Sequence, residues 1–355
     1  LDTDLSTIGT VVEDNYDVYR DVVAQKNVEN EINKLSTDVI ATCNLNANHS
    51  VIALGTSGEL TVYLIDNNTG KAIGSATPKT GNPVTASVAR LDDTHFVVQY
   101  IYATTLYARI CVVSGTSISY GSQYTIASSV SENTEIITLS DSIALSIYDS
   151  SGLKCKVIPI SGTTITTSGT EYSISGNTSA IKISATRLPD DDSGNKRVCI
   201  CFSDTGDGNK GKAVIATIDS ANAVTFGEVV TFSDGTIYAT SCAADKTGNI
   251  LVGYIEEIPS TTNKKSVFVI LNTELEAVSN KLSNHEGGIG FIQAVVYNEN
   301  KFLGVINNHV DLLGFSGEEL TLLKSYSYNT NTPGCLSVAA IEKSKILIAF
   351  ANRSN

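Results

Sequence analysis

The 355-residue sequence has no tryptophan and no methionine, only four histidines, and a 7% share of aromatic residues. The absence of tryptophan removes the indole ring that often serves as a platform for sugars. The histidines are isolated and no pair of cysteines has finger spacing, which argues against a zinc finger. No run approaches the roughly 18 apolar residues of a membrane span, so we expect no membrane insertion.

Positive charge is also scarce. The chain carries 24 basic and 37 acidic residues, a net charge of −13, and its pI is near 4.7. This balance opposes binding to phosphate backbones or anionic lipid, so nucleic acid is excluded as a partner. The first residues, LDTDLSTIGTVVED, lack the basic and apolar regions of an export signal. Because the chain begins at Leu1 and lacks methionine, we expect it to be a processed or trimmed product.

The cysteines are an odd number and lack the spacing of disulfide-stapled domains. They lie in apolar, strand-like runs, and Cys199 and Cys201 point the same way on one strand, which suits core packing. We therefore predict buried, reduced core residues at all seven positions: Cys43, Cys111, Cys155, Cys199, Cys201, Cys242 and Cys335.

A repeat of about fifty residues runs through the chain from residue 37 to residue 355. In each repeat a short apolar strand and a turn precede a second strand that ends in a large residue. Successive ends are 46, 48, 54, 52, 52 and 44 residues apart, at Leu54, Tyr100, Tyr148, Phe202, Tyr254, Ile306 and Phe350. Short strands of even spacing indicate a β-propeller of four-stranded blades. The sequence thus predicts a single all-β domain, a seven-bladed β-propeller.

The two ends of the chain predict how the ring closes. The last repeat stops after its second strand, whereas residues 16–36 can be aligned with a third and fourth strand. The N-terminal segment, residues 1–36, is therefore expected to complete the last blade and remove open sheet edges. The alternatives are an amphipathic helix over residues 13–36, and a ring of six blades with a separate N-terminal element.

The cadence from Ala86 to Tyr124, with ARLDDTHFVVQY followed by VVSGTSISYGSQY, resembles the repeats of propellers in bacteriophage tails and related bacterial surface proteins. The resemblance is one of blade style and carries no functional residue across. It implies a structural or receptor-binding module of a virion or extracellular assembly. The partners it implies are other assembly proteins or a cell-surface glycan, with a homo-oligomer also open. A cytoplasmic location stays open, because the cysteines look reduced.

Loops after the second strands of a propeller lie on the same face as the links between blades, where ligands usually bind. We predict ligand-binding residues there, with ordinary solvated turns as the alternative: Tyr102, Asp149, Asp204, Glu256 and Asn308. Paired carboxylates on this face would allow glycoside hydrolysis, so a glycosidase is the competing class. An intracellular protein-interaction scaffold is a third.

No cofactor is predicted, although two clusters of oxygen ligands around glycines are weak calcium candidates: Asp190 with Asp192, and Asp204 with Asp207. Neither matches the twelve-residue calcium loop. Nucleophile, phosphate and dinucleotide motifs are missing. His285, beside Glu286 and two glycines, is explained equally well by a blade-linking turn. We assign no catalytic residue and expect a non-enzymatic module.

Overall fold

The computed structural model describes residues 37–352, apart from residues 57, 132, 167–168, 175–178, 299, 329–332 and 343–344. The described residues form 29 strands in seven antiparallel sheets, with one short 3-10 helix, Thr205–Asp207. The predicted all-β class is confirmed. The described part of the chain has no helix long and apolar enough to cross a bilayer.

The sheets follow one another along the chain, and we number them in that order. Sheet 1 contains β1 (Thr37–Asn44), β2 (His49–Thr56), β3 (Glu59–Asp66) and β4 (Ala72–Thr80). Sheet 2 contains β5 (Pro83–Arg90), β6 (His95–Tyr102), β7 (Thr105–Ser114), β8 (Ser117–Tyr120) and β9 (Tyr124–Ala127). Sheet 3 contains β10 (Thr134–Ser140), β11 (Ile143–Asp149), β12 (Leu153–Ser161), β13 (Thr164–Ile165) and β14 (Glu171–Ser173).

The remaining sheets repeat the same order. Sheet 4 contains β15 (Ala180–Leu188), β16 (Lys196–Asp204), β17 (Lys210–Ile218), β18 (Val224–Phe226) and β19 (Val230–Ser233). Sheet 5 contains β20 (Ile237–Ala244), β21 (Ile250–Glu257), β22 (Lys264–Leu271) and β23 (Leu282–Gly287). Sheet 6 contains β24 (Ile292–Asn298), β25 (Lys301–Ile306), β26 (His309–Ser316) and β27 (Glu319–Ser327), and sheet 7 contains β28 (Pro333–Glu342) and β29 (Lys345–Asn352).

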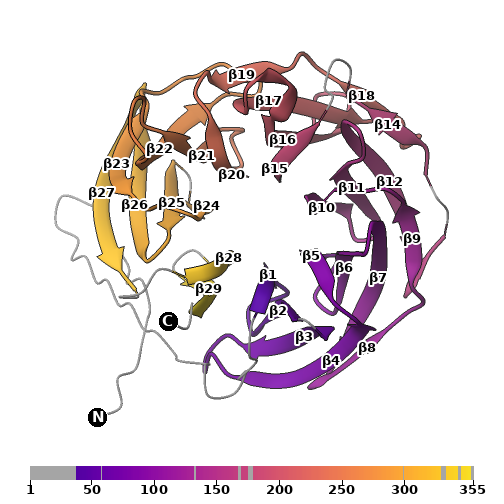
Figure 1. Ribbon diagram of the computed structural model, residues 1–355. Helices are drawn as coiled ribbons and strands as arrows, with labels where there is room; N and C mark the ends of the chain where they lie inside the picture. The colour runs from indigo at the N-terminus through magenta and orange to yellow at the C-terminus, as the bar shows by residue number, and fades with distance from the viewer. Residues whose placement is uncertain are drawn as a thin grey trace, which may run out of the picture.

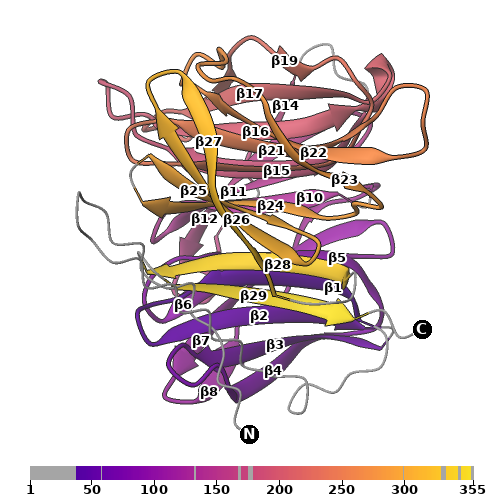
Figure 2. The same cartoon turned by 90° about the vertical axis from the view of Figure 1, so that its left-hand side faces the viewer.

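The seven sheets stand around a central opening, with the first strand of each sheet innermost (Figure 1). Sheet 7 lies beside sheet 1, so the yellow strand β28 runs next to the indigo strand β1 (Figure 2). The predicted four-stranded pattern is present in sheets 1 to 6, and in sheets 2 to 4 the outer strand is divided into two short pieces that both pair with the third strand. Each of the seven predicted second strands is the second strand of a sheet.

The core is divided among the seams between neighbouring sheets. Each apolar cluster combines residues of two adjacent sheets, and together the clusters join all seven sheets in a closed cycle. The large residues that mark the second strands belong to it, since Tyr100, Tyr148, Phe202 and Tyr254 are fully buried. Burial of so much aromatic and aliphatic surface between sheets is the main stabilising contribution to such a ring.

Serine side chains join neighbouring innermost strands at three seams. The hydroxyls of Ser87, Ser184 and Ser241 accept hydrogen bonds from backbone amides of the next sheet, at 3.2, 3.1 and 2.9 Å. The donors are the amides of Ile136, Cys242 and Ala294, in that order. These bonds satisfy amide groups of an innermost strand that face the preceding sheet.

The structure leaves the predicted closure of the ring untested. The N-terminal segment, residues 1–36, lies outside the described residues, and so do both its predicted strands and the alternative helix. Sheet 7 has two described strands, and β29 occupies the second position that in the other six sheets is followed by a third strand.

The cysteine prediction is confirmed in the main: six are buried, Cys43 is half-buried, and none forms a disulfide.

Candidate functional site

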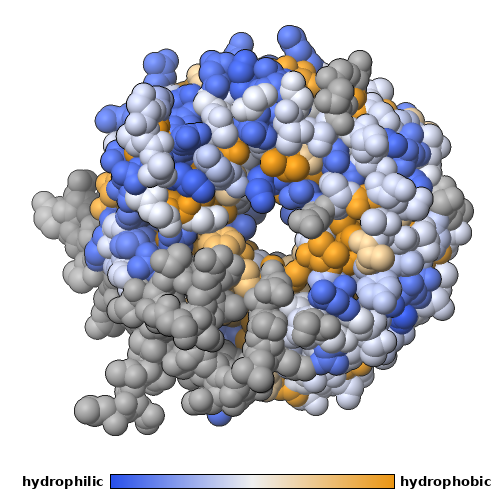
Figure 3. All heavy atoms as spheres, in the orientation of Figure 1, coloured by the Kyte–Doolittle hydropathy of each residue, from blue (hydrophilic) through white to orange (hydrophobic). Residues whose placement is uncertain are grey.

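The ring has two faces that the sequence treats differently. On one face each first strand begins and each second strand ends. We call it the link face, because the links between sheets lie there. The opposite face, which carries the hairpins between first and second strands, is the turn face. All five predicted ligand-binding residues lie on the link face or just inside it, within two residues of the end of a second strand. Around the central opening, apolar and polar surface patches alternate (Figure 3).

Tyr102 is the most exposed of the predicted residues, with 37% of its surface accessible. The ammonium group of Lys79 lies 3.9 Å from the centre of its ring, a cation–π contact. Its other neighbour is Gly81, where φ is +104° and an added Cβ would come within 2.6 Å of the ring. The glycine therefore leaves room for the aromatic ring beside the link between sheets 1 and 2.

The two predicted aspartates stabilise turns. Asp149 is buried, and its Oδ1 accepts hydrogen bonds from the amides of Gly152 and Ala180 at 3.1 and 3.0 Å, so it ties sheet 3 to the start of sheet 4. Asp204 is also buried; its carboxylate accepts from the amide of Gly206 and forms an ion pair with Lys212 at 2.7 Å. Both carboxylates therefore accept hydrogen bonds from groups inside the fold.

Glu256 and Asn308 have local partners too. Glu256 accepts a 2.5 Å hydrogen bond from the Ser233 hydroxyl and pairs with Lys265 at 3.2 Å. The backbone carbonyl of Asn308 accepts from the amide of Tyr328 at 3.0 Å. Within the described part of the chain, no hydrogen bond or ion pair joins any two of the five predicted residues, which belong to five different sheets.

The four calcium candidates fall on opposite faces. Asp190 and Asp192 follow β15 on the turn face, and Asp190 forms ion pairs with Arg187 and Lys196. Asp204 and Asp207, on the link face, share the ammonium group of Lys212 at 2.7 and 2.9 Å. These cations occupy carboxylate oxygens that a calcium ion would need as ligands. Calcium binding stays a prediction.

Nothing in the sequence indicated a second contact between a lysine and a tyrosine ring on the link face. Tyr238, at the start of the innermost strand β20, is 37% exposed, and the Lys264 ammonium lies 3.7 Å from its ring centre. Its hydroxyl donates to Glu257 at 3.3 Å. Val84 is the other exposed large apolar residue on this face, at 38%. The partners are far apart in sequence, so no local pattern connects them.

The turn face carries a polar cavity of about 590 Å³ between sheets 1 and 2. It is lined by Asn44, residues 45–49, Arg90 and Asp93. Arg90 pairs with Asp93 at 2.7 Å, and the Asn46 amide donates to the Asp93 carbonyl at 2.8 Å. The lining offers many hydrogen-bonding groups and contains no phenylalanine or tyrosine.

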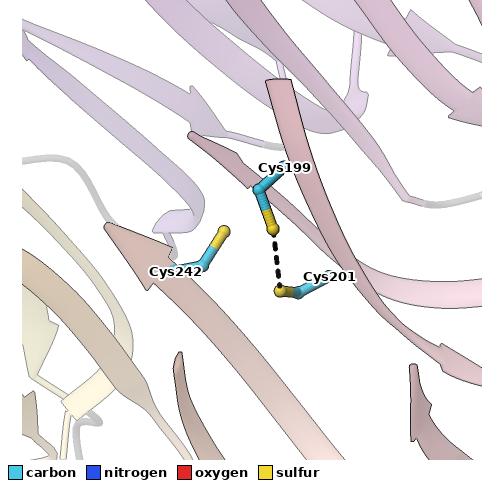
Figure 4. Close-up of side chains that lie close together, drawn as sticks. All are labelled: Cys199, Cys201 and Cys242. Atoms are coloured by element: carbon cyan, nitrogen blue, oxygen red, sulfur yellow. Dashed lines mark hydrogen bonds between the residues drawn. The ribbon is translucent and has the colours of Figure 1, made fainter. Parts of the chain in front are cut away.

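The buried thiols of sheets 4 and 5 meet at their seam. Cys199 and Cys201 come from β16 and Cys242 from β20, and all three sulfurs lie within 4.8 Å of one another (Figure 4). The Sγ atoms of Cys199 and Cys201 are 3.9 Å apart. The sequence predicted the shared orientation of the first two but gave no sign of the third.

His285 lies on the outer strand β23 and belongs to a buried polar cluster, not to a linking turn. Its Nε2 is 2.8 Å from the fully buried carboxylate of Asp311, and its ring centre is 4.7 Å from that of His309. Asp311 also accepts a 2.5 Å hydrogen bond from Ser325. Burial, the largest cause, and the neighbouring His285 lower the pKa of His309. The serine donates to the aspartate and not to a histidine, so the geometry is not that of a serine-hydrolase triad.

Comparisons with known proteins give the architecture. No family model and no curated protein matches the chain. Among solved structures, a putative 6-phosphogluconolactonase from Bacteroides fragilis is 8% identical, with 98% of each chain covered and a TM-score of 0.60. A chain of the COPII outer coat vertex is 12% identical, covering 88% of this chain and 84% of that one, with a TM-score of 0.55.

A third solved structure is the β-propeller domain of Cps50 (Swd1) from Myceliophteria thermophila. It is 10% identical, covers 86% of this chain and 90% of that one, and has a TM-score of 0.50. The chain has the β-propeller fold. The identities are low, and the named proteins range from a putative lactonase to a coat, so the likeness gives the propeller architecture alone.

Proposed function

We propose that this propeller is a non-enzymatic protein-interaction module that contacts its partner through the link face. The observation that carries the proposal is the placement of exposed large apolar residues. Three of the six such residues in the described chain, Tyr102, Tyr238 and Val84, lie on the link face. The other three, Tyr120, Leu322 and Leu323, lie on the outer strands β8 and β27, and none is in a hairpin of the turn face. Tyrosine is enriched in protein interfaces, since it combines a large apolar area with a hydrogen-bonding tip.

The carboxylates support a binding role over hydrolysis. A glycosidase needs two carboxyl groups facing each other across a sugar. Asp149 and Asp204 are buried in turn contacts, and Glu256 is held by Ser233 and Lys265. A protein scaffold therefore fits the link face better than a glycosidase does. The coat vertex and the Cps50 propeller domain offer fold-level analogies for protein partners.

The test places a photo-crosslinking phenylalanine analogue at position 102 or 238 of the full chain, in extract of the source cells. Position 120 is the matched control, because Tyr120 is 41% exposed and stacks with Arg109 but lies on the outer strand β8. We expect the same partner protein to cross-link from positions 102 and 238 and not from 120. Equal cross-linking from all three positions would reject the link face, and so would none from positions 102 and 238.

A glycan ligand is the second candidate, and the turn-face cavity is what favours it. Asparagine, arginine and aspartate side chains of the kind that line it hydrogen-bond to sugar hydroxyls. A glycan array probed with the wild-type chain and with Arg90→Ala tests this candidate. Binding that is lost in the variant supports a glycan ligand, whereas no binding by the wild-type chain would exclude it. The virion or extracellular location, and a phage-tail assembly as the partner, likewise stay proposals from the sequence resemblance.

The ring itself is proposed to have seven blades, with residues 1–36 supplying the outer strands of sheet 7. The support is that β29 holds the second position of its sheet and carries Ile346, Leu347, Ile348 and Phe350, all half-buried. A third strand would bury more of this surface and pair the edge. Deletion of residues 1–36 is expected to lower the melting temperature by several degrees. An unchanged melting temperature would contradict the closure.

A further inference from the structure

The seam between sheets 4 and 5 brings together three thiols that lie apart from the link face. Cys199 and Cys201 are fully buried and Cys242 is 6% exposed. They belong to an apolar cluster with Val252 and Ile250 of sheet 5. Sequence position does not explain the cluster, because Cys242 comes from the strand of another sheet.

The spacing of the sulfurs suits a single three-coordinate atom. Bonds of about 2.3 Å from sulfur to a central ion place three thiolates roughly 3.5 to 4.0 Å apart. Two of the sulfurs are already 3.9 Å apart, and all lie within 4.8 Å of each other. A small rotation of side chains would close the set.

The charge of the surroundings selects among thiophilic ions. The three thiols are packed within an apolar cluster, and the hydroxyl of Ser184, 3.8 Å from the Cys242 sulfur, is a neutral polar neighbour. A monovalent or divalent cation held by three thiolates would leave net negative charge in an apolar site, which is costly without a cationic partner. A trivalent ion forms a neutral complex.

We propose that Cys199, Cys201 and Cys242 form a tri-thiolate binding site for a trivalent thiophilic element, with arsenous acid as the representative ligand. In the reaction As(OH)₃ + 3 RSH → As(SR)₃ + 3 H₂O, three As–O bonds are replaced by three As–S bonds. Each thiol proton leaves with one hydroxide as water, and no atom changes oxidation state. The soft sulfur donors match the soft acceptor.

The central opening provides a route to the site. Cys242 lies on the innermost strand β20, and Ser184, half-buried on the innermost strand β15, has its hydroxyl 3.8 Å from the Cys242 sulfur. The same hydroxyl accepts the backbone amide of Cys242 at 3.1 Å and so fixes the position of this strand. Entry past the innermost strands requires local opening, so uptake is expected to be slow.

The experiment titrates the reduced full chain with arsenite and measures bound arsenic by native mass spectrometry and sulfur coordination by X-ray absorption. Cys242→Ala is the test variant. Cys155→Ala is the matched control, because Cys155 is equally buried but lies outside the three-thiol group. We expect one arsenic per chain with three sulfur ligands. Cys242→Ala should weaken binding by more than about 100-fold, since loss of even an outer-shell partner costs about 10 to 100-fold.

Three results would overturn the proposal: no uptake by the wild-type chain, fewer than three sulfur ligands, or equal weakening by Cys155→Ala. If Cys242→Ala does not fold, the sulfur count on the wild-type chain decides alone. A second readout is the melting temperature, which arsenite should raise for the wild type and for Cys155→Ala, because a ligand that binds only the folded state stabilises it.

Discussion

Two seams of the ring solve the same packing problem with different chemistry. At the seam of sheets 2 and 3, Ser87 accepts an amide of the next sheet and is paired in register with Gln99 of β6. At the seam of sheets 4 and 5, Ser184 accepts an amide in the same way and is paired with Cys201 of β16. The serine bond is common to both seams, whereas the residue beside it differs.

The difference determines what each seam can do. Gln99 is fully buried, and both ends of its side-chain amide bond to sheet 3. Its nitrogen donates to Thr134 and to the Glu135 carbonyl, and its oxygen accepts from Ser146 at 2.5 Å. Cys201 makes no such bridge and instead faces Cys199 and Cys242. Both seams therefore keep the hydrogen bond between serine and backbone amide. The residue paired with that serine on the second strand supports a hydrogen-bond network in one seam and a group of thiols in the other.

The largest expected effect comes from breaking the polar seam. Gln99→Leu keeps the volume but leaves the Ser146 hydroxyl and the Glu135 carbonyl without their buried partner. We expect a loss of about 2 to 4 kcal/mol in the free energy of unfolding. Cys201→Ala, which removes one sulfur atom from the other seam, is expected to cost only about 1 to 2 kcal/mol. Urea denaturation of both variants measures the contrast, and an equal loss would contradict it.

The second effect is a pH dependence at the polar seam. Burial raises the pKa of Glu135 to about 7, although a 2.5 Å hydrogen bond from Ser87 and the Ile136 amide favour its charged form. The folded state therefore holds this proton more tightly than the unfolded state, whose pKa is near 4.5. The resulting stability is fully present below pH 4.5 and is lost as the pH rises through 7.

Glu135→Gln isolates this contribution, which is at most about 3 kcal/mol because the side chain keeps some contact with solvent. The amide keeps the shape and does not titrate. We expect the wild-type free energy of unfolding to fall, relative to that of the variant, between pH 4.5 and pH 7. Parallel pH profiles of the two proteins would show that the Glu135 proton does not contribute.

Much of the ring was predictable because the signal is periodic. A nearly continuous apolar run with a large residue at the end of each second strand reflects burial on both faces of a strand between two seams. Tyr100 and Tyr148 illustrate this, since both mark a repeat and both are fully buried. The four-stranded repeat was predicted as well, although not the division of the outer strand in sheets 2 to 4.

The contacts across seams were not predictable from the repeat. Cys199 and Cys201 are two residues apart on one strand, so their shared direction followed from strand geometry. Cys242 joins them because the innermost strand of sheet 5 packs against the second strand of sheet 4, and that offset is set in three dimensions. Asp149 shows the same limit, because its bond to the Ala180 amide crosses between sheets.

The smallest expected effect tests the serine bond that the two seams share. Ser184→Ala removes the acceptor of the Cys242 amide and a weak contact with the Cys242 sulfur, and should cost about 1 kcal/mol. Ser87→Ala should cost about 1 kcal/mol more, since Ser87 also donates to Glu135 at 2.5 Å. Ser241→Ala, at the seam of sheets 5 and 6, is the control and should match Ser184→Ala. If urea denaturation gave the same loss for all three variants, the Glu135 contact would add nothing, and the polar seam would differ from the thiol seam through Gln99 alone.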